Sequence, residues 1–183
     1  MNVLQLFFND GPTSMPYNEL CIGLRKNINQ FIVILDSSIS KKKYPSIKIF
    51  SSNGSVFKMI FNVRKIIQDN QIDVIHIHSG HMWFILFFAL VPFNLNELKF
   101  TTFTFHTSWN LLSVRNKIFT LFAMLFSEKT VACSKSSFLS IPVLLKKIKK
   151  NKIQYIVNGY NDVFVNSVIK NSVKKNNYFE NNN

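Results

Sequence analysis

The chain has 183 residues, of which 47% are hydrophobic and 19 are phenylalanine. This composition excludes a disordered protein and predicts a single folded domain with a large core. The 22 Lys and Arg residues against 9 Asp and Glu residues give a net charge of +13. Such an excess favours nucleic acid, an anionic membrane surface or a phosphorylated ligand as partner, unless it only reflects an Asn/Lys/Ile/Phe-rich composition.

The first half of the chain alternates between short apolar runs and helical patterns. The apolar runs predict strands over Asn2–Phe8, Phe31–Leu35, Ile47–Phe50 and Asp73–His78. The helical patterns predict helices over Asn18–Asn27 and Ser55–Asp69. The apolar side of the second helix is predicted to carry Phe57, Ile60, Phe61 and Ile67.

The second half continues the same alternation. The run Met82–Phe93 is about half as long as a membrane span, so it predicts a buried helix. Further helices are predicted over Ile118–Phe126 and Ser136–Lys149, and further strands over Phe100–His106, Lys129–Ser134 and Lys152–Val157. Apolar strands that alternate with helices predict a Rossmann-like, doubly wound parallel α/β sheet with helices on both faces.

Polar residues follow five of the predicted strands. Ligands of parallel sheets bind where the carboxyl ends of the strands meet the next loops. We therefore predict that the polar residues at these five strand ends line one binding crevice. They are Asn9, Asp10, Gly11, His76, His78, Ser79, Gly80, His106, Thr107, Ser108, Ser134, Lys135, Asn158 and Gly159.

Three of the four histidines lie within the stretch HIHSGH, from His76 to His81. The spacing is similar to the H-x-H-x-D-H zinc signature of β-lactamase-type metallo-hydrolases, and alternation along a strand would put His76 and His78 on one face. Gly80 occupies the Asp position, however, and no carboxylate follows before Glu97. We therefore predict no metal site and keep a zinc hydrolase as an alternative. Two alternatives remain: His76 is a core histidine bonded to backbone, or His78 or its loop contacts a ligand.

Four runs, QIDVIHIHS, FTTFTFHTSW, EKTVACSKS and NKIQYIVNGYN, occur in an order that resembles a known family. They are similar to the D-V-I-H-x-H, T-x-H-D/T, V-x-x-x-S-x-S and K-I-x-V-I-x-N-G-v-D motifs of family-4 glycosyltransferases with the GT-B architecture. The resemblance to the N-terminal domain of that family covers residues 1–161. Residues 162–183 form an Asn/Lys-rich tail, which is either disordered or the start of a second domain.

The resemblance implies roles for particular residues. His106 resembles the histidine that faces the transferred sugar, where a neutral or cationic imidazole could stabilise charge or bond a hydroxyl. The alternative is a strand-end histidine exposed to water. The loop at Gly11 resembles the family's glycine pair, but Pro12 follows it and has no N–H to donate. Ser134 resembles the serine that opens the next helix, either as a helix cap or as a ligand contact.

The resemblance also implies the reaction, which is transfer of a sugar from a nucleotide-sugar to a glycan or lipid-linked acceptor in polysaccharide or lipopolysaccharide biosynthesis. No cofactor beyond the nucleotide-sugar substrate is expected. The family's donor-binding half cannot fit into the residues after Asn161, so the isolated chain is expected to bind with little turnover. A truncated enzyme, a half that needs a separate C-terminal-half partner, and a non-catalytic remnant or binding subunit remain open.

Location is predicted from the N-terminus, the cysteines and the lysines. The N-terminus lacks a basic leader, and Cys21 and Cys133 are expected to be reduced core residues, so a cytoplasmic protein is predicted. A lysine cluster predicts peripheral contact with the anionic inner face of the plasma membrane, or else a solvated helix end; it comprises Lys146, Lys147, Lys149 and Lys150. Nucleic acid is not predicted, because arginine is scarce and no RNA-binding motif is present.

Overall fold

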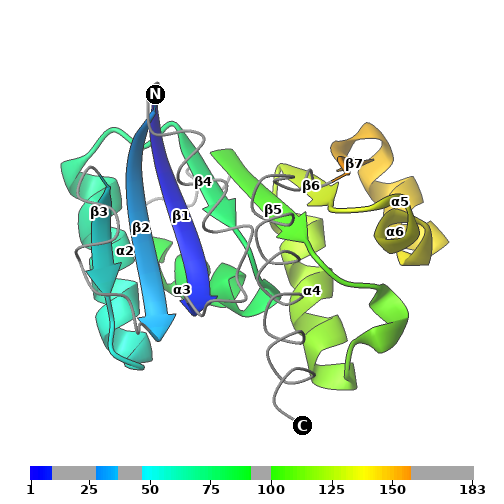
Figure 1. Cartoon of the computed structure of the whole chain (residues 1–183), viewed down its shortest axis with the longest axis horizontal. Coiled ribbons are helices and arrows are strands. Elements are labelled where there is room, and N and C mark those ends of the chain that lie inside the picture. Colours follow the sequence, from blue (N-terminus) through cyan, green and yellow to red (C-terminus); the bar gives the residue numbers. More distant parts are fainter. Residues whose placement is uncertain (10–27, 37–46, 92–99, 158–183) are drawn as a thin grey trace, which may run out of the picture.

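The computed structural model describes residues 1–9, 28–36, 47–91 and 100–157. Seven strands form one sheet in the order β3-β2-β1-β4-β5-β6-β7, and every neighbouring pair is parallel. Figure 1 shows the strands side by side, from β3 at one edge of the sheet to β7 at the other. The strands are β1 (Asn2–Asn9), β2 (Asn29–Asp36), β3 (Lys48–Ser51), β4 (Val74–Ile77), β5 (Thr101–Phe105), β6 (Lys129–Ala132) and β7 (Ile153–Tyr155). The predicted Rossmann-like parallel α/β class is therefore confirmed.

The strand order reverses at β1, which lies between β2 and β4. Gln5 of β1 is in register with Ile32 on one side and with His76 on the other. In a doubly wound sheet, a reversal of the strand order marks the place beyond the carboxyl ends of the strands where a crevice forms. The fold thus places the residues after Ile77 at the position where ligands of such sheets bind.

Three helices pack together on one face of the sheet, as Figure 1 shows. They are α2 (Val56–Asp69), α3 (Gly80–Leu90) and α4 (Val114–Phe126). Their buried side chains contact alternate residues of the strands, and these residues together form the main core; it includes Leu4, Leu6, Met59, Val63, Ile75, Ile77, Leu86, Phe103, Phe105 and Met124. Burial of these apolar side chains is the main stabilising term of the fold.

The opposite face of the sheet is mixed in character. Side chains alternate along a strand, so Gln5 and Phe7 face away from Leu4 and Leu6. Phe7 joins a small apolar cluster with Ile32, Ile34 and Ile47, whereas Gln5 donates a buried hydrogen bond of 2.7 Å to Gln30. The helix predicted over 18–27 lies outside the described residues, so helical cover of this face stays a prediction.

The predicted apolar side of α2 is partly wrong. Phe57 and Phe61 are 87% and 63% exposed. The buried residues are instead Met59, Val63 and Ile66, which recur at helical spacing on the side facing the sheet. Because α2 carries apolar residues on both stripes, the sequence pattern alone does not decide which stripe meets the sheet.

Three helices have boundaries that differ from the predictions, and the first is α3, which was predicted over Met82–Phe93 but spans Gly80–Leu90. The single helix predicted over Ser136–Lys149 is two helices, α5 (Lys135–Ser140) and α6 (Val143–Lys149). Pro142 separates them, since proline lacks an N–H and disfavours helical geometry in the residue before it. α4 begins four residues before the predicted Ile118, because the side chain of Ser113 caps it by accepting a 3.4 Å hydrogen bond from the Asn116 N–H.

Two short 3-10 turns complete the described part of the chain. They are η3 (Trp109–Leu111), which precedes α4, and η4 (Lys150–Lys152), which leads into β7. None of the helices among the described residues has the length and apolar character that crossing a bilayer requires.

Candidate functional site

Three neighbouring parallel strands bring polar residues together at one edge of the sheet. β4, β5 and β6 end at Ile77, Phe105 and Ala132, and each is followed directly by a residue whose side chain makes a hydrogen bond. These residues are His78, His106 and Cys133, which come from segments far apart in the sequence. The predicted convergence of the strand ends after β4, β5 and β6 is confirmed by this topology.

A pocket of about 150 Å³ lies between the ends of β4 and β5 and the first turns of α3 and α4. Five of the predicted site residues line it: His78, Ser79, Gly80, His106 and Thr107. Asn9 ends β1, whereas Asp10, Gly11, Asn158 and Gly159 lie outside the described residues. The structure therefore gathers the central part of the predicted crevice into one cavity.

Two buried polar atoms of the pocket have no hydrogen-bond partner among the described residues. They are Oγ of Ser79 and Oδ1 of Asn116, and both residues line the cavity. Ser79 is the N-cap residue of α3, yet its side chain makes no capping bond. Buried polar atoms are normally paired, and the two exceptions here belong to residues that line the same cavity. Sequence analysis missed Asn116, whose only signal is a polar residue in a helical first turn.

Gly80 shapes the pocket through packing. A Cβ atom at this position would lie 2.7 Å from the carbonyl carbon of Phe119 and 2.8 Å from the backbone nitrogen of Thr120. Only glycine allows the start of α3 to approach the backbone of α4 this closely. The predicted site glycine thus closes the wall of the pocket that α3 and α4 share.

The histidines contact one another and neighbouring strands. His76 Nε2 lies 2.6 Å from Thr104 Oγ1, so its partner is a side chain rather than the backbone group that we predicted. His78 Nδ1 lies 3.4 Å from His106 Nε2, and His106 Nδ1 lies 3.1 Å from Cys133 Sγ. The predicted core role of Cys133 is wrong, because its side chain is partly exposed at the strand end.

Burial favours the neutral form of these imidazoles. It lowers the pKa of His76 to about 4, with a further lowering from His106. Burial is also the main cause that holds the pKa of His78 well below its ordinary value, and it lowers the pKa of His106 although part of that side chain is exposed. At neutral pH the cluster can therefore hydrogen-bond a hydroxyl but supplies little positive charge for a phosphate.

The zinc-like spacing does not produce a zinc-like arrangement. His76 bonds to Thr104, whereas the ring of His81 packs against Phe119 with ring centroids 4.3 Å apart. Within the described ranges, no three His, Cys, Asp or Glu side chains are grouped so that they could hold a metal ion. His78, His81 and His106 instead line the pocket, and the His78 ring contacts the rings of His76 and His106.

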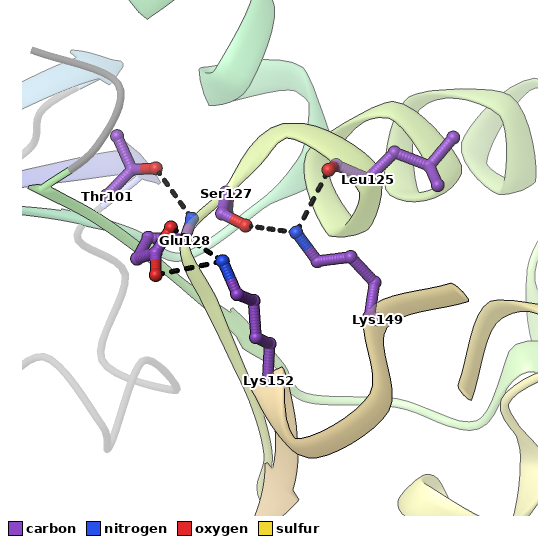
Figure 2. Close-up of polar contacts among 6 residues, drawn as sticks. All are labelled: Thr101, Leu125, Ser127, Glu128, Lys149 and Lys152. Atoms are coloured by element: carbon purple, nitrogen blue, oxygen red, sulfur yellow. Dashed lines mark hydrogen bonds and ion pairs between the residues drawn. The ribbon is translucent and has the colours of Figure 1, made fainter. Parts of the chain in front are cut away.

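Ser134 and two of the predicted membrane-facing lysines make contacts within the fold. The hydroxyl of Ser134 caps α5 by accepting a 3.0 Å hydrogen bond from the Ser137 N–H, and its role in ligand contact stays a prediction. Lys149 Nζ donates to the carbonyl oxygens of Leu125 at 3.0 Å and Ser127 at 2.7 Å, as Figure 2 shows. Lys146 Nζ likewise lies near the carbonyl oxygens that end α5, Phe138 and Leu139.

The lysines of this region therefore differ in whether their ammonium groups are available to a binding partner. Burial lowers the pKa of Lys149. Lys149 stabilises carbonyl groups at the end of α4, and Lys146 does the same at the end of α5. Lys152 forms an ion pair of 3.0 Å with Glu128 (Figure 2). Lys147 and Lys150 are exposed, so they are the members of the predicted cluster that face solvent.

Known structures support the same fold. The chain is similar to HepE from Anabaena, solved in complex with UDP and glucose, with a TM-score of 0.62 and 14% identity over 88% of this chain and 45% of that one. It is also similar to the UDP-GlcNAc 2-epimerase of Neisseria meningitidis bound to UDP-GlcNAc, with a TM-score of 0.59 and 16% identity over 96% of this chain and 52% of that one. The chain thus spans about half the length of these proteins.

The family of the chain is assigned by a family model, because structural similarity at such low sequence identity shows only the fold. No curated protein is significantly similar to the chain in sequence. The model described as Glycosyltransferase Family 4 matches residues 19–163, which include the ends of β4, β5 and β6 and the whole pocket. The chain therefore belongs to glycosyltransferase family 4.

Proposed function

We propose that the chain is the acceptor-binding half of a glycosyltransferase that moves a sugar from a nucleotide-sugar to a glycan or lipid-linked acceptor, as in polysaccharide assembly. The observation that carries this proposal is the pocket with its unpaired Ser79 Oγ and Asn116 Oδ1 beside His106. Sugar hydroxyls both donate and accept hydrogen bonds, so one ring could partner all three groups. The complex of HepE with UDP and glucose supports a sugar as the ligand class.

The neutral histidines favour the acceptor rather than the donor diphosphate. Stabilisation of a leaving diphosphate requires fixed positive charge, which the pocket histidines do not supply at neutral pH. We infer that those charges come from a second domain or a separate partner half, since the chain covers 45% to 52% of the solved relatives. The donor is a nucleotide-sugar substrate, and no further cofactor takes part.

Binding measurements on two variants test the proposal. In calorimetry with methyl glucoside as the probe, Ser79→Ala and Asn116→Leu each lose one hydrogen bond to the sugar, so roughly 5- to 10-fold weaker binding is expected. Thermal stability should hold or rise, because each change removes an unpaired buried atom. Asn151→Ala, at an exposed position of η4, is the control. Unchanged affinity in both pocket variants would exclude this pocket.

Turnover tests the half-site part of the proposal. The 183-residue chain mixed with UDP-glucose and a glycan acceptor is expected to release no UDP. Steady release that depends on the acceptor would show that this chain carries the whole active site. Release that appears only when a second protein from the native host is added would identify the partner half.

We also propose that α6 contacts the inner face of the plasma membrane. Leu144 and Ile148 of α6 are exposed and lie beside the exposed Lys147 and Lys150. Exposed apolar side chains with flanking lysines favour anionic lipid, at about 1 kcal/mol for each lysine near the surface. Sedimentation with phosphatidylglycerol vesicles should therefore exceed that with phosphatidylcholine vesicles. Leu144→Glu with Ile148→Glu should abolish the difference, and equal sedimentation of the unmodified chain with both lipids would refute the contact.

A further inference from the structure

A chain of side-chain hydrogen bonds crosses five neighbouring strands on the face opposite the main core. Gln30 of β2 bonds to Gln5 of β1 at 2.7 Å, and Gln5 bonds to His78 after β4 at 3.3 Å. His78 bonds to His106 after β5 at 3.4 Å, and His106 bonds to Cys133 after β6 at 3.1 Å. The relay, defined as these five residues, ends at the pocket, which His78 and His106 line.

The direction of each hydrogen bond in the relay follows from the one before it. Gln5 Nε2 donates to Gln30 Oε1, so Gln5 Oε1 is the atom that accepts from His78 Nε2–H. A neutral imidazole has a single N–H, hence His78 Nδ1 accepts from His106 Nε2–H. His106 Nδ1 is then an acceptor, and the thiol of Cys133 donates to it.

Packing keeps the His78 ring in this orientation. Phe7 stacks on the His78 ring with ring centroids 4.1 Å apart and planes 13° apart. The centroid of the His76 ring, on the same face of the sheet, lies 4.0 Å from that of His78. His76 is itself held by Thr104. Rotation of His78 would therefore disturb several buried side chains as well as the bond to Gln5.

We propose that Gln5 and Cys133 are positioning residues of the sugar site: they hold His106 as the neutral Nε2–H tautomer, with Nδ1 presented to the ligand as a hydrogen-bond acceptor. The proposal rests on the proposed function. A thiol is a weak donor, so the bond from Cys133 is the weakest link in the relay. A ligand hydroxyl can replace it at Nδ1 while His78 continues to hold Nε2.

This geometry selects the chemical class of the ligand group. A neutral polyol carries hydroxyl hydrogens that it can donate to Nδ1 of His106. A phosphate monoester at neutral pH carries one or no hydrogen and inorganic phosphate one or two, so phosphate mainly accepts, and it finds no N–H at this atom. The relay thus favours a sugar ring over a phosphate at His106.

Side-chain ¹⁵N correlation spectra of the 183-residue chain at pH 7 test the tautomer without any ligand. We expect His78 and His106 both to be neutral and protonated on Nε2 alone. An imidazolium signal, an Nδ1–H tautomer or averaging between the two tautomers at His106 would overturn the proposal.

Variants at the two ends of the relay separate positioning from simple packing. Cys133→Ser keeps a donor, so His106 Nδ1 should retain the shift of an accepting nitrogen, whereas Cys133→Ala should move it toward that of a free one. Gln5→Met removes the acceptor of the His78 Nε2–H, so His78 and His106 should become tautomer mixtures. If Gln5→Met fails to fold, the comparison of Cys133→Ser with Cys133→Ala still tests the proposal, because Cys133 lies partly exposed at a strand end. Identical spectra for Cys133→Ser and Cys133→Ala contradict the role of the thiol.

Addition of ligand probes separates this inference from the proposed function. Methyl glucoside should move the Nδ1 resonance of His106 and leave its Nε2–H in place, whereas inorganic phosphate should move neither. Glucoside binding with an unchanged Nδ1 resonance would contradict the positioning role. A complete lack of glucoside binding would count against the proposed function, and the tautomer spectra would still decide the relay.

Discussion

The two faces of the sheet are built from the same strands but have different roles. On the face covered by α2, α3 and α4, residues such as Leu6 and Ile77 are fully buried in a large apolar core. On the other face, Gln5 and His78 take part in the relay that leads to the pocket. Because side chains alternate, Gln5 and its neighbour Leu6 belong to different faces. One strand therefore contributes to stability and to the site through adjacent residues.

The largest expected effect comes from breaking the covered face. Leu6→Ala removes a fully buried side chain, so the free energy of unfolding should fall by roughly 2–5 kcal/mol in urea denaturation. Phe8→Ala is the control on the same strand, because the Phe8 side chain is 47% exposed. A Phe8→Ala loss as large as that of Leu6→Ala would show that burial in the core does not set this effect.

Acid should weaken the polar face selectively. The pKa of His76 is lowered from 6.5 to about 4 in the folded protein, so the unfolded chain binds more protons between these values. Stability from this group is therefore complete above pH 6.5 and is lost as the pH falls toward 4, by about 3 kcal/mol. Urea unfolding of the wild type and His76→Gln at pH 7 and pH 4 measures it. The variant should lose less stability, whereas equal losses would show that His76 is not held neutral.

The contact between α3 and α4 is the next largest effect. Gly80→Ala places a Cβ 2.7 Å from the Phe119 carbonyl carbon, and backbone atoms cannot move aside as a flexible side chain can. A loss of roughly 1–3 kcal/mol in unfolding free energy is expected, together with weaker sugar binding. Phe88→Ala, at an exposed position of the same helix, should change binding little. Full stability of Gly80→Ala would mean that the helices are further apart.

The smallest expected effect concerns the lysines at the edge of the covered face. Lys149→Met removes a donor from the carbonyl oxygens of Leu125 and Ser127 and a cation from the end of α4. Thermal denaturation should report a loss of about 1 kcal/mol. Lys147→Met, at an exposed position of the same helix, should cost almost nothing. Similar losses for both lysines would indicate a general charge effect rather than a helix cap.

Much of the described fold was predictable because its strands are apolar runs between helices. That pattern fixes parallel crossovers, and it placed His78 and His106 at adjacent strand ends. The break at Pro142 was also readable from the sequence, since proline has no N–H to continue a helix. The choice between Phe57 and Met59 for the buried side of α2 was not, because apolar residues occupy both sides of that helix.

The relay could not be predicted from the sequence. Gln5 and His78 are 73 positions apart, and their contact depends on β1 lying beside β4 in the sheet. A polar glutamine inside the apolar strand NVLQLFF was the only signal. Asn116 likewise lines the pocket because α4 packs beside α3, a contact that the sequence does not show.

The most direct test of the account is a map of backbone amide resonances of the chain during titration with methyl glucoside. The account predicts that the perturbed resonances cluster at 78–81, 104–107 and Asn116, the residues around the pocket. Perturbations that concentrate on α2 or α6, with these positions unchanged, would contradict a sugar site at the strand ends.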